Sequence, residues 1–169
     1  GVAYVINLDG SRQEILKSDE RKYKRILMGK AINSIPKKAR DRVVMFTCPF
    51  INGPLPIHSP DFGDKIAAEI EDDVAKGARG LKIHKTLGLT LKDENGNLIR
   101  VDEEALDPIW EKCAELDIPV LIHSADPAAF FQPIDRFNEH WLTLKMHPGW
   151  QFTPPQFPTY EAILSQRDN

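Results

Sequence analysis

Two stretches of the chain place polar side chains where a buried strand would end. In Gly80-Leu-Lys-Ile-His-Lys, Lys82 interrupts an apolar run, and His84 follows on the same face because side chains alternate along a strand. Lys85 lies on the other face if the strand continues. A buried lysine is unfavourable unless its charge is paired or chemically removed. Lys82 is therefore a candidate for chemistry, with a salt bridge to a neighbouring strand as the structural alternative.

The second stretch is Val120-Leu-Ile-His-Ser-Ala-Asp, in which His123 closes a hydrophobic run. An imidazole at a strand end can bind a metal ion or transfer a proton, and a structural histidine explains the position equally well. We expect Asp126 to be a loop residue. The other histidines fall in proline-rich stretches and are expected to be loop residues rather than ligands: His58, His140 and His147.

Alternating strands and helices must position these residues. Short apolar runs predict buried strands at 2–8, 42–48, 79–84 and 118–123. Helical spacing of apolar residues predicts helices at 18–31, 62–74 and 106–116, and a last short helix from Thr159. Ser18 is the expected N-cap of the first helix and Asp102 or Asp107 that of the third, while Gly77 ends the second. Asn95-Gly96 predicts a hairpin turn.

The order of elements indicates an α/β fold. Strands that are hydrophobic on both faces and alternate with helices predict a parallel sheet covered by helices, either doubly wound or a (β/α) barrel. The loops after the strands are long, and 124–158 alone holds six of the 13 prolines. The turns before the strands are short. This asymmetry favours an active face at the carboxyl ends of the strands, as in (β/α) barrels.

Composition excludes several classes of protein. The 169 residues are 41% hydrophobic and 28% charged, no apolar run is long enough to span a bilayer, and the start of the chain is not a signal peptide. We expect a cytoplasmic rather than an exported protein. The net charge of −3 argues against nucleic-acid binding, and the basic stretch 12–42 is interpreted as a solvated helix face. Cys48 and Cys113 are expected to be buried small hydrophobic residues.

Two segments in this order resemble the middle of a metal-dependent amidohydrolase, in the amidohydrolase-2 or TIM-barrel metal-dependent hydrolase group. They are Gly77-Ala-Arg-Gly-Leu-Lys-Ile-His-Lys-Thr-Leu-Gly-Leu and Ile118-Pro-Val-Leu-Ile-His-Ser-Ala-Asp-Pro. The resemblance implies a (β/α)8 TIM-barrel fold, with residues 1–169 forming a single partial barrel domain of about four parallel strands. Because such a barrel needs ~250 residues, we expect a segment of a longer domain, holding strands two to five.

The resemblance also implies roles for individual residues. His123 matches the metal ligand at the end of the fifth strand, and Lys82 matches the lysine that is carboxylated and bridges two metals in binuclear members. Mononuclear branches do without that lysine, so Lys82 is equally a candidate substrate-binding or structural residue. The implied cofactor is a divalent metal ion, Zn²⁺ in the first instance. Lys85 and His84 are the candidate substrate-binding residues. The substrate is a small molecule, and no catalytic residue is assigned.

The family's first-strand His-x-His, its sixth-strand His and its eighth-strand Asp have no counterpart in this chain. Lys82 and His123 alone fall short of the three protein ligands that a catalytic zinc has. The leading hypothesis is therefore hydrolysis of an amide, ester or lactone by metal-activated water, with this segment inactive by itself. Decarboxylation stays open, since some branches of the group are decarboxylases.

Two other hypotheses remain. In an aldolase-like barrel, Lys82 or Lys85 would form a Schiff base, because desolvation favours the nucleophilic amine. In a non-catalytic half-barrel, two unpaired strand edges and an apolar inner face would promote association, including formation of a homo-oligomer.

Overall fold

The computed structural model describes residues 4–8, 12–17, 20–25, 28–49 and 56–168. Its main sheet has four strands in the order β1-β4-β5-β6, and each pair of neighbours is parallel. The strands are β1 (Val5–Asn7), β4 (Val43–Thr47), β5 (Ala78–Ile83) and β6 (Val120–Ile122). All four predicted strands are present, and the predicted parallel sheet is confirmed. β1, β4 and β6 are shorter than expected, whereas β5 has the expected length and begins one residue earlier.

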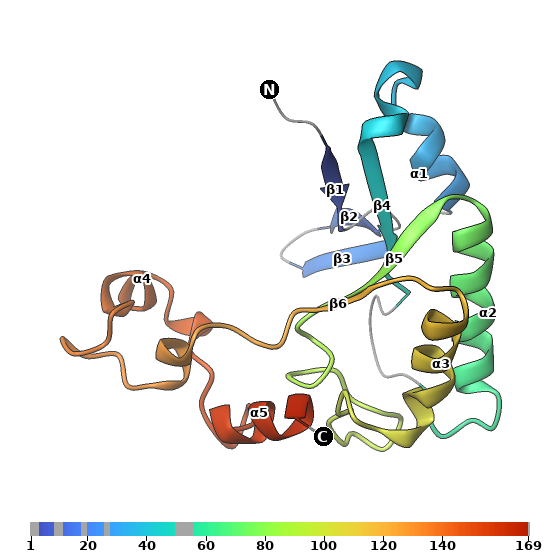
Figure 1. Ribbon diagram of the computed structural model, residues 1–169. Coiled ribbons are helices and arrows are strands. Elements are labelled where there is room, and N and C mark those ends of the chain that lie inside the picture. Colours follow the sequence, from blue (N-terminus) through green and yellow to red (C-terminus); the bar gives the residue numbers. More distant parts are fainter. Residues whose placement is uncertain (1–3, 9–11, 18–19, 26–27, 50–55, 169) are drawn as a thin grey trace.

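One α-helix lies between each successive pair of these strands, and two more follow β6. They are α1 (Met28–Ser34), α2 (Phe62–Ala75), α3 (Asp107–Glu115), α4 (Trp141–Met146) and α5 (Tyr160–Asp168). The 3-10 helices are η1 (Lys37–Arg42), η2 (Glu104–Leu106), η3 (Ala128–Phe131) and η4 (Pro148–Trp150). Figure 1 shows α1, α2 and α3 on one side of the sheet, while the chain after β6 leads away into a lobe that holds α4. The four parallel strands with their helices form a curled half-barrel, which is part of a (β/α) barrel.

Side-chain alternation along β5 explains how the helices pack on the sheet. Leu81 and Ile83 are fully buried in one cluster with Ile70 of α2 and with Ile109 and Cys113 of α3. Both strand residues therefore face the helices, and the residue between them faces the opposite side of the sheet. Gly77 has φ +110°, a left-handed conformation that glycine adopts readily, so its predicted place at the end of the second helix is confirmed.

The predicted helix at 18–31 is wrong over most of its length. β2 (Arg12–Lys17) and β3 (Glu20–Arg25) pair as an antiparallel hairpin in which Lys17 is opposite Glu20, and helix begins only at Met28. The basic stretch is thus a hairpin followed by a short helix rather than one helix face. The expected cap Ser18 lies outside the described residues.

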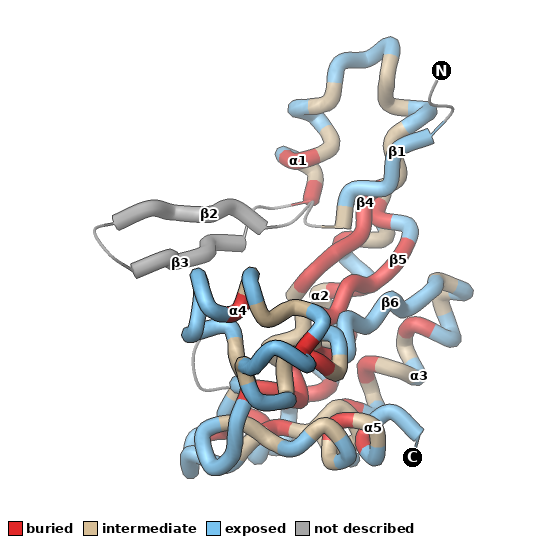
Figure 2. The backbone as a smooth tube through the Cα atoms, turned by 90° about the vertical axis from the view of Figure 1, so that its left-hand side faces the viewer, coloured by how far each residue is buried: buried red, intermediate tan, exposed pale blue. Residues whose placement is uncertain are grey.

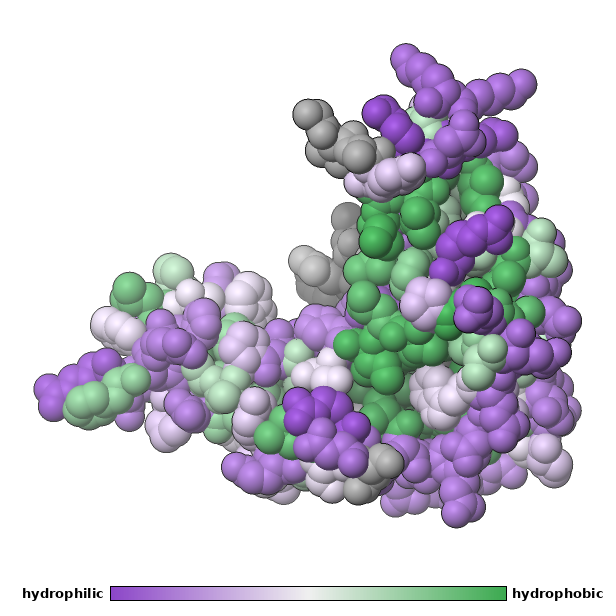
Figure 3. Space-filling model, viewed as in Figure 1, coloured by the Kyte–Doolittle hydropathy of each residue, from purple (hydrophilic) through white to green (hydrophobic). Residues whose placement is uncertain are grey.

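Burial differs between the central and the outer strands. The prediction of four buried strands holds for β4 and β5 but is wrong for β1 and β6, as Figure 2 shows. Ile6 is 57% exposed and Leu121 is 42% exposed. The reason is the strand order, since β1 and β6 are the outer strands of the described sheet and lack a neighbour on one side. Hydrophobic side chains accordingly gather on the surface around β4–β6 in Figure 3.

The segment between β5 and α3 corrects one local prediction and supports another. Gly96 has φ +85° beside an antiparallel bridge between Lys92 and Leu98, which confirms the predicted turn. Neither Asp102 nor Asp107 caps α3 as predicted, because the helix follows directly from η2 and has no side-chain cap. Asp102 instead accepts hydrogen bonds from Arg100 at 2.8 and 2.6 Å. Within the described residues, no helix is long and apolar enough to cross a membrane.

Candidate functional site

Lys82 lies on the face of β5 opposite the helices. Its neighbours Leu81 and Ile83 pack on α2 and α3, so alternation turns the lysine to the other side, where it is only 6% exposed. It pairs in register with Leu121 of β6. Gly80 lies two residues before Lys82, and a Cβ on Gly80 would lie 2.5 Å from the ring of Phe46. The backbone of β5 at Gly80 is therefore packed closely against Phe46 of β4.

His84 and His123 meet where β5 and β6 end. Ile83 and Ile122 are partners in the parallel register, and the His123 backbone N–H donates to the Ile83 carbonyl at 3.0 Å. The two imidazole rings lie edge to face, with centroids 6.2 Å apart and planes inclined by 62°. The Nδ1 atom of His84 is buried. The structure thus brings together a predicted metal ligand and a predicted substrate-binding residue.

The surroundings of His123 favour its neutral form. Burial lowers the pKa of the imidazole, the nearby positive charges of Lys82 and Lys85 lower it further, and Asp126 opposes them. A neutral imidazole can accept a proton or bind a metal ion. The site can therefore offer a proton acceptor at neutral pH.

Lys85, the other predicted substrate-binding residue, is held in an ion pair. Its Nζ lies 2.5 Å from a carboxylate oxygen of Asp126 and 5.4 Å from the ring centre of Phe152. Asp126 is a loop residue, as predicted. Its contact with Lys85 was not predicted from the sequence. The chain turns toward Lys85 at Ala125, whose φ of +62° is unusual for a residue other than glycine.

The other three histidines make local contacts outside this pair. His58 Nε2 lies 3.0 Å from Asp93, whose carboxylate also accepts hydrogen bonds from the backbone of Asn95 and Asn97. His140 packs on Phe130 and His147 stacks on Trp150, with ring centroids 5.4 and 4.4 Å apart. None of the three belongs to a helix or strand, as predicted.

The described residues do not complete a metal site. Among them, no group of three or more His, Cys, Asp or Glu side chains is placed to hold one ion. His123 and a carboxylated Lys82 would supply two ligands where a catalytic zinc has three. The two cysteines add none: Cys48 and Cys113 are buried, as predicted, and burial raises the pKa of the Cys113 thiol to about 11. We therefore derive no reaction step through a metal.

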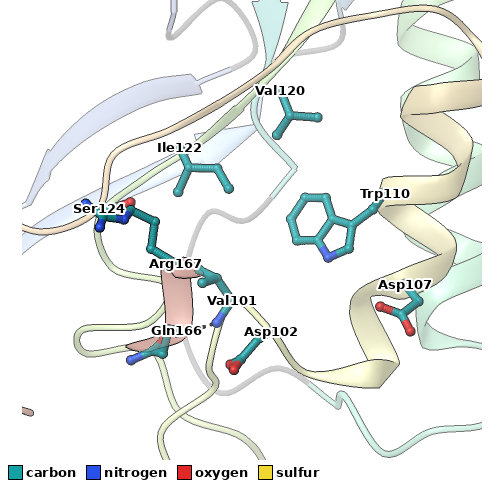
Figure 4. Close-up of a pocket in the computed structure, with 9 residues that line it drawn as sticks. All are labelled: Val101, Asp102, Asp107, Trp110, Val120, Ile122, Ser124, Gln166 and Arg167. Atoms are coloured by element: carbon teal, nitrogen blue, oxygen red, sulfur yellow. Dashed lines mark hydrogen bonds between the residues drawn. The ribbon is translucent and has the colours of Figure 1, made fainter. Parts of the chain in front are cut away.

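Two cavities adjoin the ends of the strands, on different sides. One of about 480 Å³ borders Lys85 and Asp126. The other, of about 920 Å³, is an open groove beside Trp110, Val120 and Ile122, which Figure 4 shows lining it together. Because Val120 and Ile122 alternate with His123 along the strand, the groove lies on the face of β6 away from the imidazole pair. The smaller cavity is the one next to the candidate site.

Comparison with known families decides the assignment. A family model described as Amidohydrolase matches residues 39–151, which include β4, β5, β6 and every candidate residue above. The chain belongs to the amidohydrolase family. The match confirms the expected family, and the parallel half-barrel agrees with the expected fold. Members of this family are generally metal-dependent hydrolases. No curated protein and no solved structure gave a significant match.

Proposed function

We propose that this amidohydrolase-family chain contributes to hydrolysis of an amide, ester or lactone bond held at the ends of β5 and β6. The observation that carries the proposal is that the imidazole rings of His84 and His123 lie edge to face at adjacent strand ends, with centroids 6.2 Å apart. In (β/α) barrels the active site lies at this end of the strands. The small-molecule substrate would lie against the imidazole pair.

Each side chain of the pair has a chemical role in this proposal. The imidazole of His123, in its neutral form, takes the proton of the water that attacks the carbonyl carbon and returns it to the leaving nitrogen or oxygen as the C–N or C–O bond breaks. Lys82, buried on the same face of β5, provides positive charge that stabilises the negative charge developing on the carbonyl oxygen. His84 orients the carbonyl group beside His123.

A divalent metal ion, Zn²⁺ in the first instance, remains part of the proposal because the family is generally metal-dependent. When a metal ion is bound, His123 and a carboxylated Lys82 are instead its proposed ligands from this chain, and the proton-accepting role of His123 and the positive charge of Lys82 belong to the metal-free site. Since the described residues supply too few ligands, we propose that the 169-residue chain is inactive by itself. Metal-dependent turnover by this chain alone would overturn that part of the proposal.

Histidine NMR tests whether the pair binds a carbonyl substrate. Acetamide, ethyl acetate and γ-butyrolactone are each titrated into the purified protein while the ring signals of its five histidines are followed. We expect at least one compound to shift the signals of His84 and His123 in a saturable way, and the control variant His58→Ala to retain this response, because His58 contacts Asp93 outside the site. Equal shifts of all five histidines, or no shift with any compound, would contradict the proposal.

Borohydride reduction distinguishes hydrolysis from the Schiff-base alternative. Reduction in the presence of an aldehyde or ketone substrate would trap a covalent adduct on Lys82 or Lys85 if either lysine formed an imine. We expect no stoichiometric adduct at either position by peptide mass spectrometry. An adduct confined to one of the two would favour the aldolase-like reaction.

A second candidate function, association with another copy of the chain, is favoured by one observation. β6 carries aliphatic residues exposed on both of its faces and is an outer strand of the described sheet. Its Val120-Leu-Ile sequence holds no charge that would discourage pairing with another strand. Sedimentation velocity over a range of concentrations tests for the homo-oligomer.

A further inference from the structure

The cavity of about 480 Å³ lies between two loops that are far apart in the sequence. Leu89, on the loop after β5, forms one wall, and Phe130, Trp150 and Phe152, on the loop after β6, form the others. Its volume falls within the range of small-molecule sites, which are mostly apolar with a few placed polar groups. The walls therefore suit an aromatic ring or a branched aliphatic group.

These walls are held in place before any ligand binds. Leu89 and Phe152 are buried in one hydrophobic cluster, at 2% and 8% exposure. The Phe152 backbone N–H donates to the Phe130 carbonyl at 2.8 Å, and the two rings stack with centroids 6.4 Å apart. Trp150 is stacked on His147. A preformed cavity of this kind loses little conformational entropy on binding.

The polar part of the cavity is the ion pair of Lys85 and Asp126. The pair has no net charge, so it favours an uncharged ligand group over an anion or a cation. The Lys85 ammonium donates hydrogen bonds and the Asp126 carboxylate accepts them, and Nζ and Oδ2 lie only 2.5 Å apart. A carboxamide matches both, because its carbonyl oxygen accepts from Lys85 and its N–H donates to Asp126.

The polar end of the cavity adjoins the imidazole pair. Lys85 follows His84 directly in the chain, and the charges of Lys85 and Asp126 both act on the His123 imidazole. A group bound between Lys85 and Asp126 would thus be near the bond that we propose is hydrolysed.

We propose that this cavity is a specificity pocket that binds the aromatic or branched aliphatic substituent of a carboxamide, with the amide group against Lys85 and Asp126. This inference rests on the proposed function, since it names the class of substrate for the same site. It selects amides with a bulky apolar substituent over small amides.

Calorimetric titration tests the pocket without requiring turnover. Phenylacetamide, acetamide and phenylacetate are each titrated into the purified protein. We expect phenylacetamide to bind at least about tenfold more tightly than acetamide, because only the former buries a ring. We also expect phenylacetamide to bind more tightly than the anion phenylacetate.

Filling the cavity provides the matched test. Gly149 lines it, and a Cβ on Gly149 would meet no atom within 4 Å, so Gly149→Leu adds bulk without a backbone clash. We expect this variant, and the second filling variant Thr90→Phe, to weaken phenylacetamide binding at least about tenfold with an unchanged circular dichroism spectrum. The control Phe137→Leu, at a residue 81% exposed and outside the cavity lining, should bind like the original protein.

Each outcome separates the pocket from the proposed function. Equal affinities for acetamide and phenylacetamide, or full binding by both filling variants, would overturn the pocket. Tighter binding of phenylacetate would overturn the uncharged carboxamide as its ligand. If phenylacetamide binds in the pocket but leaves the His84 and His123 signals unshifted, the pocket stands and the proposed reaction fails. If those signals respond to small amides that gain nothing from a ring, the reaction stands and the pocket fails.

Discussion

The ring of His84 lies edge to face with the ring of His123, with centroids 6.2 Å apart, although 39 positions separate the two residues in the chain (123 − 84). The contact follows from the parallel register, in which Ile83 and Ile122 are partners, so the next residue of each chain segment leaves the sheet at the same level. Two imidazoles that are unremarkable as single sequence positions become a pair because adjacent strands end together.

The charges around this pair predict opposite effects of two substitutions on the pKa of His123. Burial and the ammonium groups of Lys82 and Lys85 lower it, whereas Asp126 raises it. Lys82→Met removes a positive charge that disfavours the imidazolium, so the pKa should rise. Asp126→Asn removes a negative charge that favours it, so the pKa should fall. NMR titration of the His123 ring in metal-free protein measures both.

The wild-type protein should show His123 titrating below the ordinary histidine pKa of 6.5. Lys65→Met serves as a control, because Lys65 lies on α2 and pairs with Asp61, away from the imidazole pair. This variant should leave the His123 titration unchanged. A rise in the pKa on Asp126→Asn would show that Asp126 does not act on His123 in the way the structure indicates.

The packing of α2 on α3 predicts that Gly63→Ala destabilises the protein. A Cβ on Gly63 would lie 2.8 Å from Cγ of Pro108 and 3.0 Å from the Ala105 carbonyl oxygen, so the two helices would have to separate. We expect a loss of about 1–3 kcal/mol in the free energy of unfolding, which is usual for overpacking. Urea denaturation followed by circular dichroism measures it.

Gly29→Ala is the matched control, since Gly29 is a helical glycine in α1 with only Lys76 Cδ, at 3.9 Å, near its added Cβ. Alanine favours helix over glycine by up to about 1 kcal/mol, so this variant should be as stable as the original protein or more stable. Equal destabilisation by both substitutions would mean that the close approach of α2 and α3 is not the cause.

The sequence predicted the strands and α2 because their signals are local. An apolar run marks β4, the apolar residues on either side of Lys82 mark β5, and the helical spacing of Phe62, Ile66 and Ile70 marks α2. Which strands lie at the edges of the sheet is not a local property. The aliphatic residues of β6 therefore suggested burial, whereas the strand order leaves them exposed.

The candidate site was predictable in part for the same reason. Lys82 and His123 stand out because each ends or interrupts an apolar run. The ion pair of Lys85 and Asp126 joins residues 41 positions apart and depends on a left-handed turn at Ala125. Alanine does not favour that conformation, so no local pattern indicated where Asp126 would lie. The hairpin of β2 and β3 was missed because its charged sequence also suits a solvated helix.

Burial predicts that the thiol of Cys113 resists modification in the folded protein. Its side chain is 1% exposed, and burial raises its pKa to about 11, so it stays protonated and unreactive near pH 8. Cys48 is likewise fully buried. Ellman's reagent at pH 8 should modify neither cysteine within minutes, and both should react in 6 M guanidinium chloride. Rapid modification of Cys113 in native buffer would show that α3 opens readily from the sheet.

The exposed edge of the sheet predicts that Leu121→Lys reduces self-association. The Pro119 carbonyl and the His123 N–H, which flank β6, form hydrogen bonds with β5. Because backbone direction alternates along a strand, the N–H and C=O groups of Val120 and Ile122 point away from β5, to the side where the described sheet ends. A second β6 strand could pair there. A lysine in the strand opposes such pairing through its charge. Sedimentation velocity should show a lower weight-average mass for Leu121→Lys than for the original protein.

Leu142→Lys, at a leucine of α4 that is 60% exposed, is the control and should sediment as the original protein does. If both variants lower the mass equally, general surface hydrophobicity rather than the β6 edge causes association.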